Sequence, residues 1–234
     1  MDRITRKELK SDRFALEVEH SVSYVSHHRK NFLQWGGIAL GVVVLLVAIF
    51  WYRGYRHGVR QEALSSALRI QNASVGPQQS EFALGYPTEA DKKNASNKAF
   101  TELAAKYPNS DEGSIAEYYL GASAADKGDL AQAEKRFKLV ADNGEKAYAS
   151  LAKLSLAQTY QAQGKLSEAE NIVKSIIDHP TVLVSKEEAV IALAHIMATS
   201  KPQEARKLLE PLRSSQRSAI SRAALTALSD IPQK

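Results

Sequence analysis

Residues 128–137 read GDLAQAEKRF, residues 164–173 read GKLSEAENIV, and residues 200–209 read SKPQEARKLL. These stretches follow one another at a period of 36 residues, and each has alanine at its sixth position: Ala133, Ala169 and Ala205. Four residues later stands a larger apolar residue: Phe137, Val173 and Leu209. A fixed period of roughly 20–50 residues is typical of stacked repeats. The pattern predicts helical hairpins in which alanine lies where two helices cross closely.

The residues before the first two stretches strengthen this interpretation. Leu120-Gly121 and Leu156-Ala157 are matching pairs of a large and a small residue, and Tyr160 follows the second pair after three positions. This layout resembles the tetratricopeptide repeat, which has W-x-x-L-G-x-x-Y in its first helix, then A-x-x-x-F, then proline. The resemblance implies an α-solenoid. An unrelated helical bundle is the alternative.

The repeats extend in both directions. Upstream, Phe100, Leu103-Ala104 and Pro108 match the second helix of a further repeat. Either residues 60–73 form its first helix, with residues 76–90 inserted as a loop, or that segment packs differently.

Downstream, Pro211 falls inside the third hairpin and should kink it or end it early. Ser185 and Glu188 form a capping box at a helix start. The last segment, residues 218–228, is predicted to be a capping helix that closes the stack. Its apolar face comprises Ile220, Ala224, Leu225 and Leu228.

A membrane anchor precedes the repeats. The 22 residues between Lys30 and Arg53 carry no charge, and at about 1.5 Å per residue they span a hydrocarbon core of about 30 Å. Trp35 and Trp51 stand at the two ends, where amphipathic rings prefer the headgroups. A signal peptide would have a shorter apolar run followed by small residues, so the anchor is predicted to remain uncleaved.

Gly37 and Gly41 form a G-x-x-x-G face that would let a second transmembrane helix approach and so form a homo-oligomer. Glycine is also simply common in such helices, which leaves pairing as one of two interpretations. The predicted fold class is therefore all-α: one transmembrane helix, then a tetratricopeptide-repeat-like α-solenoid of about three to four hairpins with a C-terminal capping helix. The predicted segments are a tail (1–30), the anchor (31–52), a membrane-proximal helix and loop (53–90), and the repeat domain (91–234).

The orientation of the anchor follows from its flanking charges. Lys and Arg close to the two ends are balanced, but the tail adds Arg3, Arg6, Lys7 and Lys10. Because a long trailing domain is translocated largely regardless of its own charges, the tail is predicted to be cytoplasmic and the repeat domain to lie outside.

Composition argues against several function classes. The chain of 234 residues has no cysteine and a net charge of +5, which is too dilute for a nucleic-acid interface. Its six histidines are scattered, and Gly164-Lys165 lacks the flanking residues of a phosphate-binding loop. We therefore expect no catalytic, cofactor or metal site, and no enzyme.

Stacked hairpins instead build a curved binding surface, whose inner wall comes mainly from the first helix of each pair. The repeat register predicts a groove for a peptide or protein there. Its predicted wall comprises Tyr118, Ala122, Leu154, Gln158, Val190, Ala194 and Met197.

The order of tail, anchor and degenerate repeats over nearly the whole chain resembles the YfgM-like family, described as ancillary SecYEG translocon subunits. The resemblance implies a single-pass protein of the bacterial inner membrane with its repeats in the periplasm. Its implied partners are translocon subunits and a membrane-anchored periplasmic chaperone or folding factor. The alternatives are a scaffold in envelope assembly or cell division and, with reversed orientation, a cytoplasmic-facing membrane regulator.

Overall fold

The computed structural model describes residues 29–76, 84–108 and 110–232. The N-terminal tail, whose basic residues set the predicted orientation, lies outside the described residues. By internal contacts the chain divides into two compact units, Met1–Gly58 and Val59–Lys234. Each unit is described by itself.

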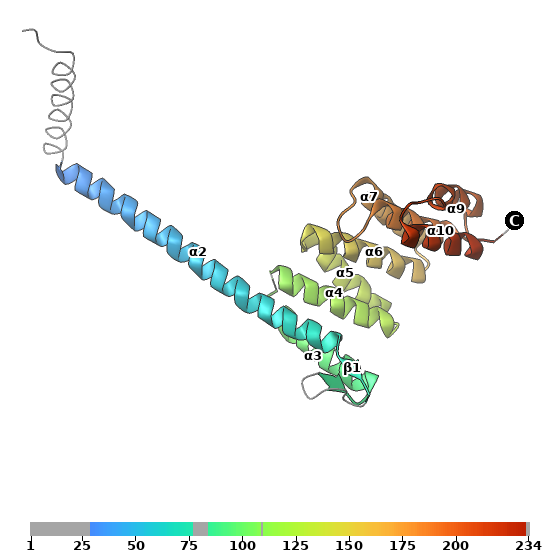
Figure 1. The fold of residues 1–234 in the computed structure, drawn as a ribbon, viewed down its shortest axis with the longest axis horizontal. Coiled ribbons are helices and arrows are strands. Elements are labelled where there is room, and N and C mark those ends of the chain that lie inside the picture. Colours follow the sequence, from blue (N-terminus) through green and yellow to red (C-terminus); the bar gives the residue numbers. More distant parts are fainter. Residues whose placement is uncertain (1–28, 77–83, 109, 233–234) are drawn as a thin grey trace, which may run out of the picture. The chain divides into compact units, whose positions relative to one another are not determined.

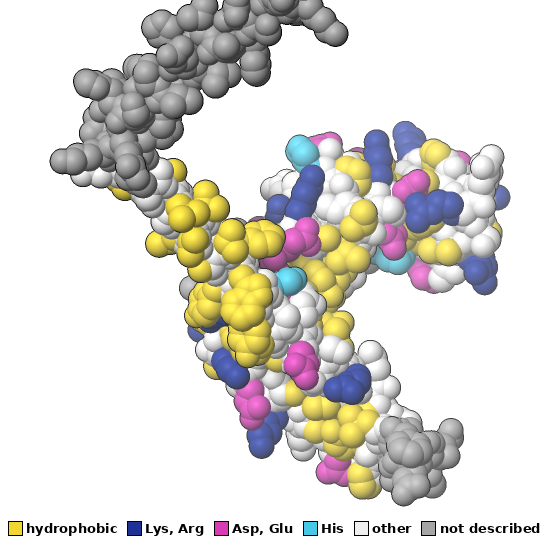
Figure 2. All heavy atoms as spheres, turned by 60° about the vertical axis from the view of Figure 1, so that its left-hand side comes forward, with side chains coloured by type: hydrophobic (Ala, Val, Ile, Leu, Met, Phe, Trp, Pro, Cys, Tyr) yellow, Lys and Arg dark blue, Asp and Glu magenta, His cyan; other side chains and the backbone are white. Residues whose placement is uncertain are grey.

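The first unit contains most of helix α2, which spans Arg29–Gln71. Among the described residues this is the one helix long and apolar enough to cross a membrane. Its apolar side chains are exposed, as Figure 2 shows, and Phe50 reaches 83%. The rings of Trp51 and Tyr55 stack with centroids 6.5 Å apart, at one end of the apolar run. An exposed apolar run of this length is stable in lipid and unstable in water.

The second unit is built almost entirely of helices that follow one another from α3 to α10 (Figure 1). Each helix packs mainly on its neighbours in the chain. The helices after α2 are α3 (Glu89–Lys106), α4 (Asp111–Asp126), α5 (Leu130–Asn143), α6 (Lys146–Ala162), α7 (Leu166–Asp178), α8 (Lys186–Met197), α9 (Pro202–Leu209), the short 3-10 helix η1 (Glu210–Leu212) and α10 (Ser218–Asp230). The predicted all-α class is confirmed, with hairpins α4–α5, α6–α7 and α8–α9.

The alanine column that defined the repeat lies in the core. Ala133, Ala169 and Ala205 are fully buried, and so are the three larger residues that follow them by four positions. Gly121 shows why small residues are needed at the crossing, because a Cβ there would lie 2.9 Å from the Phe137 ring. Only the smallest side chains let the paired helices approach this closely.

The end of α2 packs on α3, the helix predicted to be the second of the upstream half repeat. Leu64 and Ala67 share a buried cluster with Phe100 and Leu103 of α3. This contact is the one expected if residues 60–73 form the first helix of that repeat. A small parallel ladder joins the two ends of the inserted loop: β1 (Ser74–Val75), just before it, pairs with β2 (Gly85–Tyr86), inside it. These strands were not predicted from the sequence.

At the other end, Pro211 has the predicted effect. Helix α9 ends at Leu209 and continues as η1, so the third hairpin is cut short. Helix α10 buries Ile220 and Ala224 as predicted, whereas Leu225 is exposed. Ala227 is buried instead of Leu225. The face of α10 that packs on the stack is therefore rotated slightly from the predicted face.

An ionic cluster recurs at the same period of 36 residues. Glu134 lies 3.1 Å from the ammonium of Lys165, and Glu170 lies 3.0 Å from that of Lys201. Each carboxylate is on the second helix of a hairpin, and each lysine is in the turn that precedes the second helix of a hairpin. The repeat therefore includes polar contacts as well as apolar packing.

These clusters predict acid sensitivity. Side-chain hydrogen bonds hold the pKa of both carboxyls below the ordinary value, from Gln163 and then Lys165 at Glu134, and from Lys201 at Glu170. A carboxyl with a lowered folded-state pKa adds stability above its unfolded pKa, and that stability is lost as pH falls through the folded pKa. Thermal unfolding followed by circular dichroism should show a fall in Tm below about pH 4.5. The double variant Glu134→Gln, Glu170→Gln should have a flatter acid limb, and an unchanged limb would contradict this role.

Candidate binding groove

A groove lies between α6 and α8, which are the first helices of two successive hairpins. It encloses about 200 Å³. Leu154 of α6 and Ile191 of α8 supply apolar surface, and Gln158 and His195 supply polar groups. The other lining residues are Ala157, Gln161, Val173, Glu188, Ala192 and Ile196.

The polar side chains of the groove are two amides, a carboxylate and an imidazole. Gln161 donates its side-chain N–H to the carbonyl oxygen of His195 at 3.3 Å, which joins α6 to α8. The carboxylate of Glu188 is occupied by the capping box, since it accepts from the backbone N–H and the hydroxyl of Ser185, both at 2.8 Å. Gln158 is exposed. Such a surface can bury an apolar side chain while an exposed amide bonds to a peptide backbone.

The structure brings together some of the predicted wall residues. Leu154 and Gln158 both line the groove. Tyr118 and Ala122 lie on α4 and are half-buried, and Tyr118 contacts α6 through Tyr148, with ring centroids 6.0 Å apart. Burial raises the pKa of Tyr148, so this phenol stays neutral at physiological pH.

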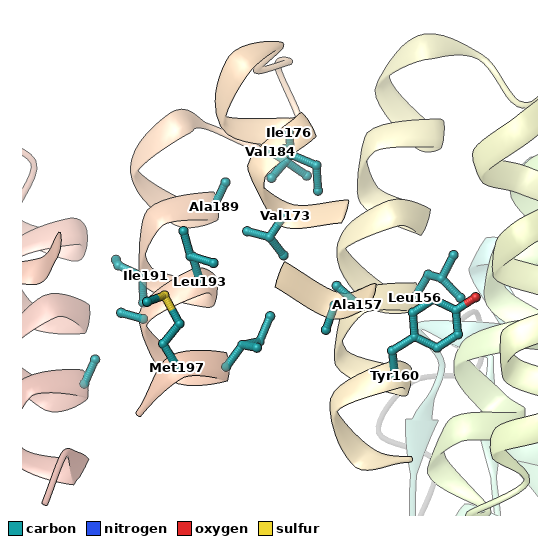
Figure 3. Close-up of a cluster of buried hydrophobic side chains, with 14 of the residues drawn as sticks. Leu156, Ala157, Tyr160, Val173, Ile176, Val184, Ala189, Ile191, Leu193 and Met197 are labelled. Atoms are coloured by element: carbon teal, nitrogen blue, oxygen red, sulfur yellow. The ribbon is translucent and has the colours of Figure 1, made fainter. Parts of the chain in front are cut away.

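The predicted residues of α8 lie differently. Val190 is half-buried, while Ala194 and Met197 belong to the core with 0% and 4% exposure. Figure 3 shows Met197 within the cluster of buried side chains, with Ile191 and Leu193. Ala194 and Met197 therefore lie in the core and do not line the groove.

The cause is a change of register by one residue in α8. Tyr160 and Ala169 are nine positions apart, whereas their buried counterparts Met197 and Ala205 are eight apart. The first two hairpins turn at glycines with positive φ, Gly128 and Gly164, but Ser200 stands at the third turn. Positive φ is unfavourable for a residue with a Cβ, so this turn is built differently. As a result Ile191 and His195 take the groove positions predicted for Val190 and Ala194.

Gly37 and Gly41 lie in α2, and a Cβ at either position would meet nothing within 4 Å. That face can admit a second helix, and pairing through it stays a prediction. Within residues 29–76, 84–108 and 110–232, no three His, Asp or Glu side chains gather closely enough to hold a metal ion.

The model of a family described as "Tetratricopeptide repeat-like domain" matches residues 30–180. Comparison with curated proteins and with solved structures finds no match. The matched segment includes α2 and the hairpins up to α7, and α8 adds the second wall of the groove.

Proposed function

Because the chain belongs to the tetratricopeptide repeat-like family, whose model matches more than half of its residues, we propose that it is a membrane-anchored module for protein–protein interaction. Repeat domains of this kind are typically non-catalytic and bind partners on their inner surface. The groove between α6 and α8 is the observation that carries the proposal. Helix α2 supplies the anchor.

The finer part of the proposal is the place of action. The resemblance to ancillary translocon subunits supports a role at the protein translocon of the bacterial inner membrane, with the repeats in the periplasm. There the groove would contact translocon subunits and a membrane-anchored chaperone or folding factor. The anchor supports this role because it confines the groove to partners that share the bilayer.

Site-specific photocrosslinking in living cells tests the groove. A photoreactive residue at Gln158, in the groove, should crosslink to translocon subunits or a periplasmic chaperone. The same residue at Lys135, exposed on α5, is the matched control. Equal products from both positions, or products at Gln158 without any translocon or chaperone component, would overturn the proposal. Products from division proteins would support a scaffold in cell division instead.

A substitution in the groove should weaken the same crosslink. Leu154→Asp places a charge on the apolar wall and removes the burial of a leucine side chain, worth about 1.5–3 kcal/mol. We expect the crosslink from Gln158 to fall at least about tenfold. Leu139→Asp on the exposed face of α5 should leave the yield unchanged. A yield that survives Leu154→Asp would show that the partner binds elsewhere.

Orientation is tested separately with protease. Added to spheroplasts, it should digest the repeat domain while the membrane is intact. A domain that resists until the membrane is broken would instead face the cytoplasm and favour the membrane regulator.

A further inference from the structure

A second pocket lies at the other end of α6 and differs from the groove in chemistry. It encloses about 180 Å³ between the start of α6, the end of α7 and the loop that leads to α8. Two lysines and a histidine line it together with three hydroxyls: Lys146, Lys153, His179, Ser150, Ser175 and Thr181. No lining residue carries a carboxylate. We call this the basic pocket.

The two ammonium groups are the permanently charged donors of the basic pocket, beside the imidazole of His179. Lys146 and Lys153 are seven positions apart on α6 and so lie on one face of the helix, two turns apart. Among the described residues neither lysine has a carboxylate within 4.0 Å, although nine other ion pairs are formed. A cationic pocket without an internal counter-ion is complementary to an anionic group of a ligand.

The hydroxyls of the pocket already have partners within the protein, so the charged side chains are the groups left to hold an anion. Ser150 donates to the carbonyl oxygen of Ala147 at 2.8 Å, and Ser175 donates to that of Ile172 at 2.7 Å. Thr181 must therefore donate in its short bond to Ser150. Each ammonium has three N–H donors, and a carboxylate accepts through both of its oxygens, so one carboxylate can bond to both lysines.

The residues around the basic pocket favour a protein, and not a lipid bilayer, as the source of the anionic group. Val182, directly after Thr181, is 93% exposed, and Leu183 follows it, so the rim is apolar. Glu145 and Asp178 flank the pocket in sequence, and Glu145 is held in place by accepting from the Ala147 N–H at 3.0 Å. These acids neutralise the wider surface, which disfavours an anionic bilayer because lipid recognition uses clusters of several basic residues. A single carboxylate inside the pocket still meets the two lysines at close range.

We propose that the basic pocket binds a carboxylate of an acidic and apolar segment in a protein partner. That the partner is a protein rests on the proposed function, but the pocket is a different site from the groove. The acidic side chain pairs with Lys146 and Lys153, and its apolar neighbours cover Val182 and Leu183. A partner that uses both sites would be held at two points along α6.

Methyl NMR of the full chain can observe the two sites in one spectrum. Ile176 lines the basic pocket and Ile191 lines the groove, so their labelled δ1 methyls report separately. The chain is placed in nanodiscs of zwitterionic phospholipid. The probes are a synthetic peptide with one glutamate between leucines and the same peptide with glutamine. We expect a saturable shift of the Ile176 methyl with the glutamate peptide, and at least fivefold weaker binding of the glutamine peptide.

Lysine variants complete the test. Lys146→Gln, Lys153→Gln should abolish the Ile176 shift, Lys146→Arg, Lys153→Arg should retain it, and the control Lys127→Gln, Lys135→Gln should leave it unchanged. Equal shifts with both peptides, or a shift that persists in Lys146→Gln, Lys153→Gln, would overturn the proposal. A shift at Ile191 alone would move the carboxylate to the groove and also overturn it. A shift caused by nanodiscs of anionic phospholipid, with none from the glutamate peptide, would identify the occupant as a bilayer. The crosslinking result at Gln158 does not depend on any of these outcomes.

Discussion

Phe137→Ala is expected to lower the free energy of unfolding of the second unit by about 3–5 kcal/mol, the range for removing a buried phenylalanine. Phe137 is 2% exposed and packs beside Tyr118, with ring centroids 5.7 Å apart. It also lies against Gly121, so it fills the space where α4 and α5 cross. Each hairpin contacts mainly its neighbours. A cavity at this position therefore weakens the packing among α4, α5 and α6.

Urea denaturation of the full chain in detergent, followed by far-ultraviolet circular dichroism, measures this effect. Leu139→Ala is the matched control, since Leu139 lies on the same helix but is 48% exposed. That substitution should change the free energy of unfolding by less than about 0.5 kcal/mol. If both variants lost equal stability, the packing role assigned to Phe137 would be refuted.

Glu112→Ala is the second substitution with a large expected effect, a loss of about 2–3 kcal/mol. The Glu112 side chain is 1% exposed, accepts from Arg60 at 3.0 Å and accepts from Gln61 at 2.9 Å. Burial opposes its charge, but hydrogen bonding to backbone and the Arg60 guanidinium bring the net pKa below the ordinary value. Removal of the carboxylate leaves a partly buried cation unpaired, which is why the effect exceeds that of a surface pair.

The same denaturation measurement applies, with Glu210→Ala as the control. Glu210 also pairs with an arginine, Arg213, but its side chain is 60% exposed. An exposed pair contributes about 0–1 kcal/mol. Hydrogen exchange should further show that Glu112→Ala loses protection first in residues 59–71, where α2 packs on α3. A uniform loss over the unit would contradict a local role for Glu112.

Much of this fold is predictable because residue size repeats. The alanine column, the larger residues behind it and the effect of Pro211 are all confirmed by burial and helix bounds. The small space at each helix crossing admits only a small residue. The same small residue therefore recurs at a fixed spacing, and this can be recognised in a single sequence. The apolar run of α2 is equally predictable, because about 20 consecutive residues without a charge are typical of a transmembrane helix.

The rest depends on contacts that local patterns do not reveal. The register of α8 changes at a turn that lacks glycine, so a strict period of 36 predicts Val190 and Ala194 where Ile191 and His195 line the groove. The lysine in each repeated ion pair lies 31 residues after its glutamate. Matching the repeats by residue size does not reveal such a contact between successive hairpins. Sequence spacing does not predict the basic pocket, because its lining comes from α6, the end of α7 and the loop after α7.

The chain of neighbour-to-neighbour contacts from α3 to α10 has a consequence for the time course of folding. Hairpins of this kind close short loops, and proteins with such local contacts fold quickly. During synthesis each hairpin can form as soon as its second helix has left the ribosome, because it packs on the hairpin that has already folded. We expect an ordered, vectorial assembly that starts beside α2 and is completed when α10 covers the last exposed face.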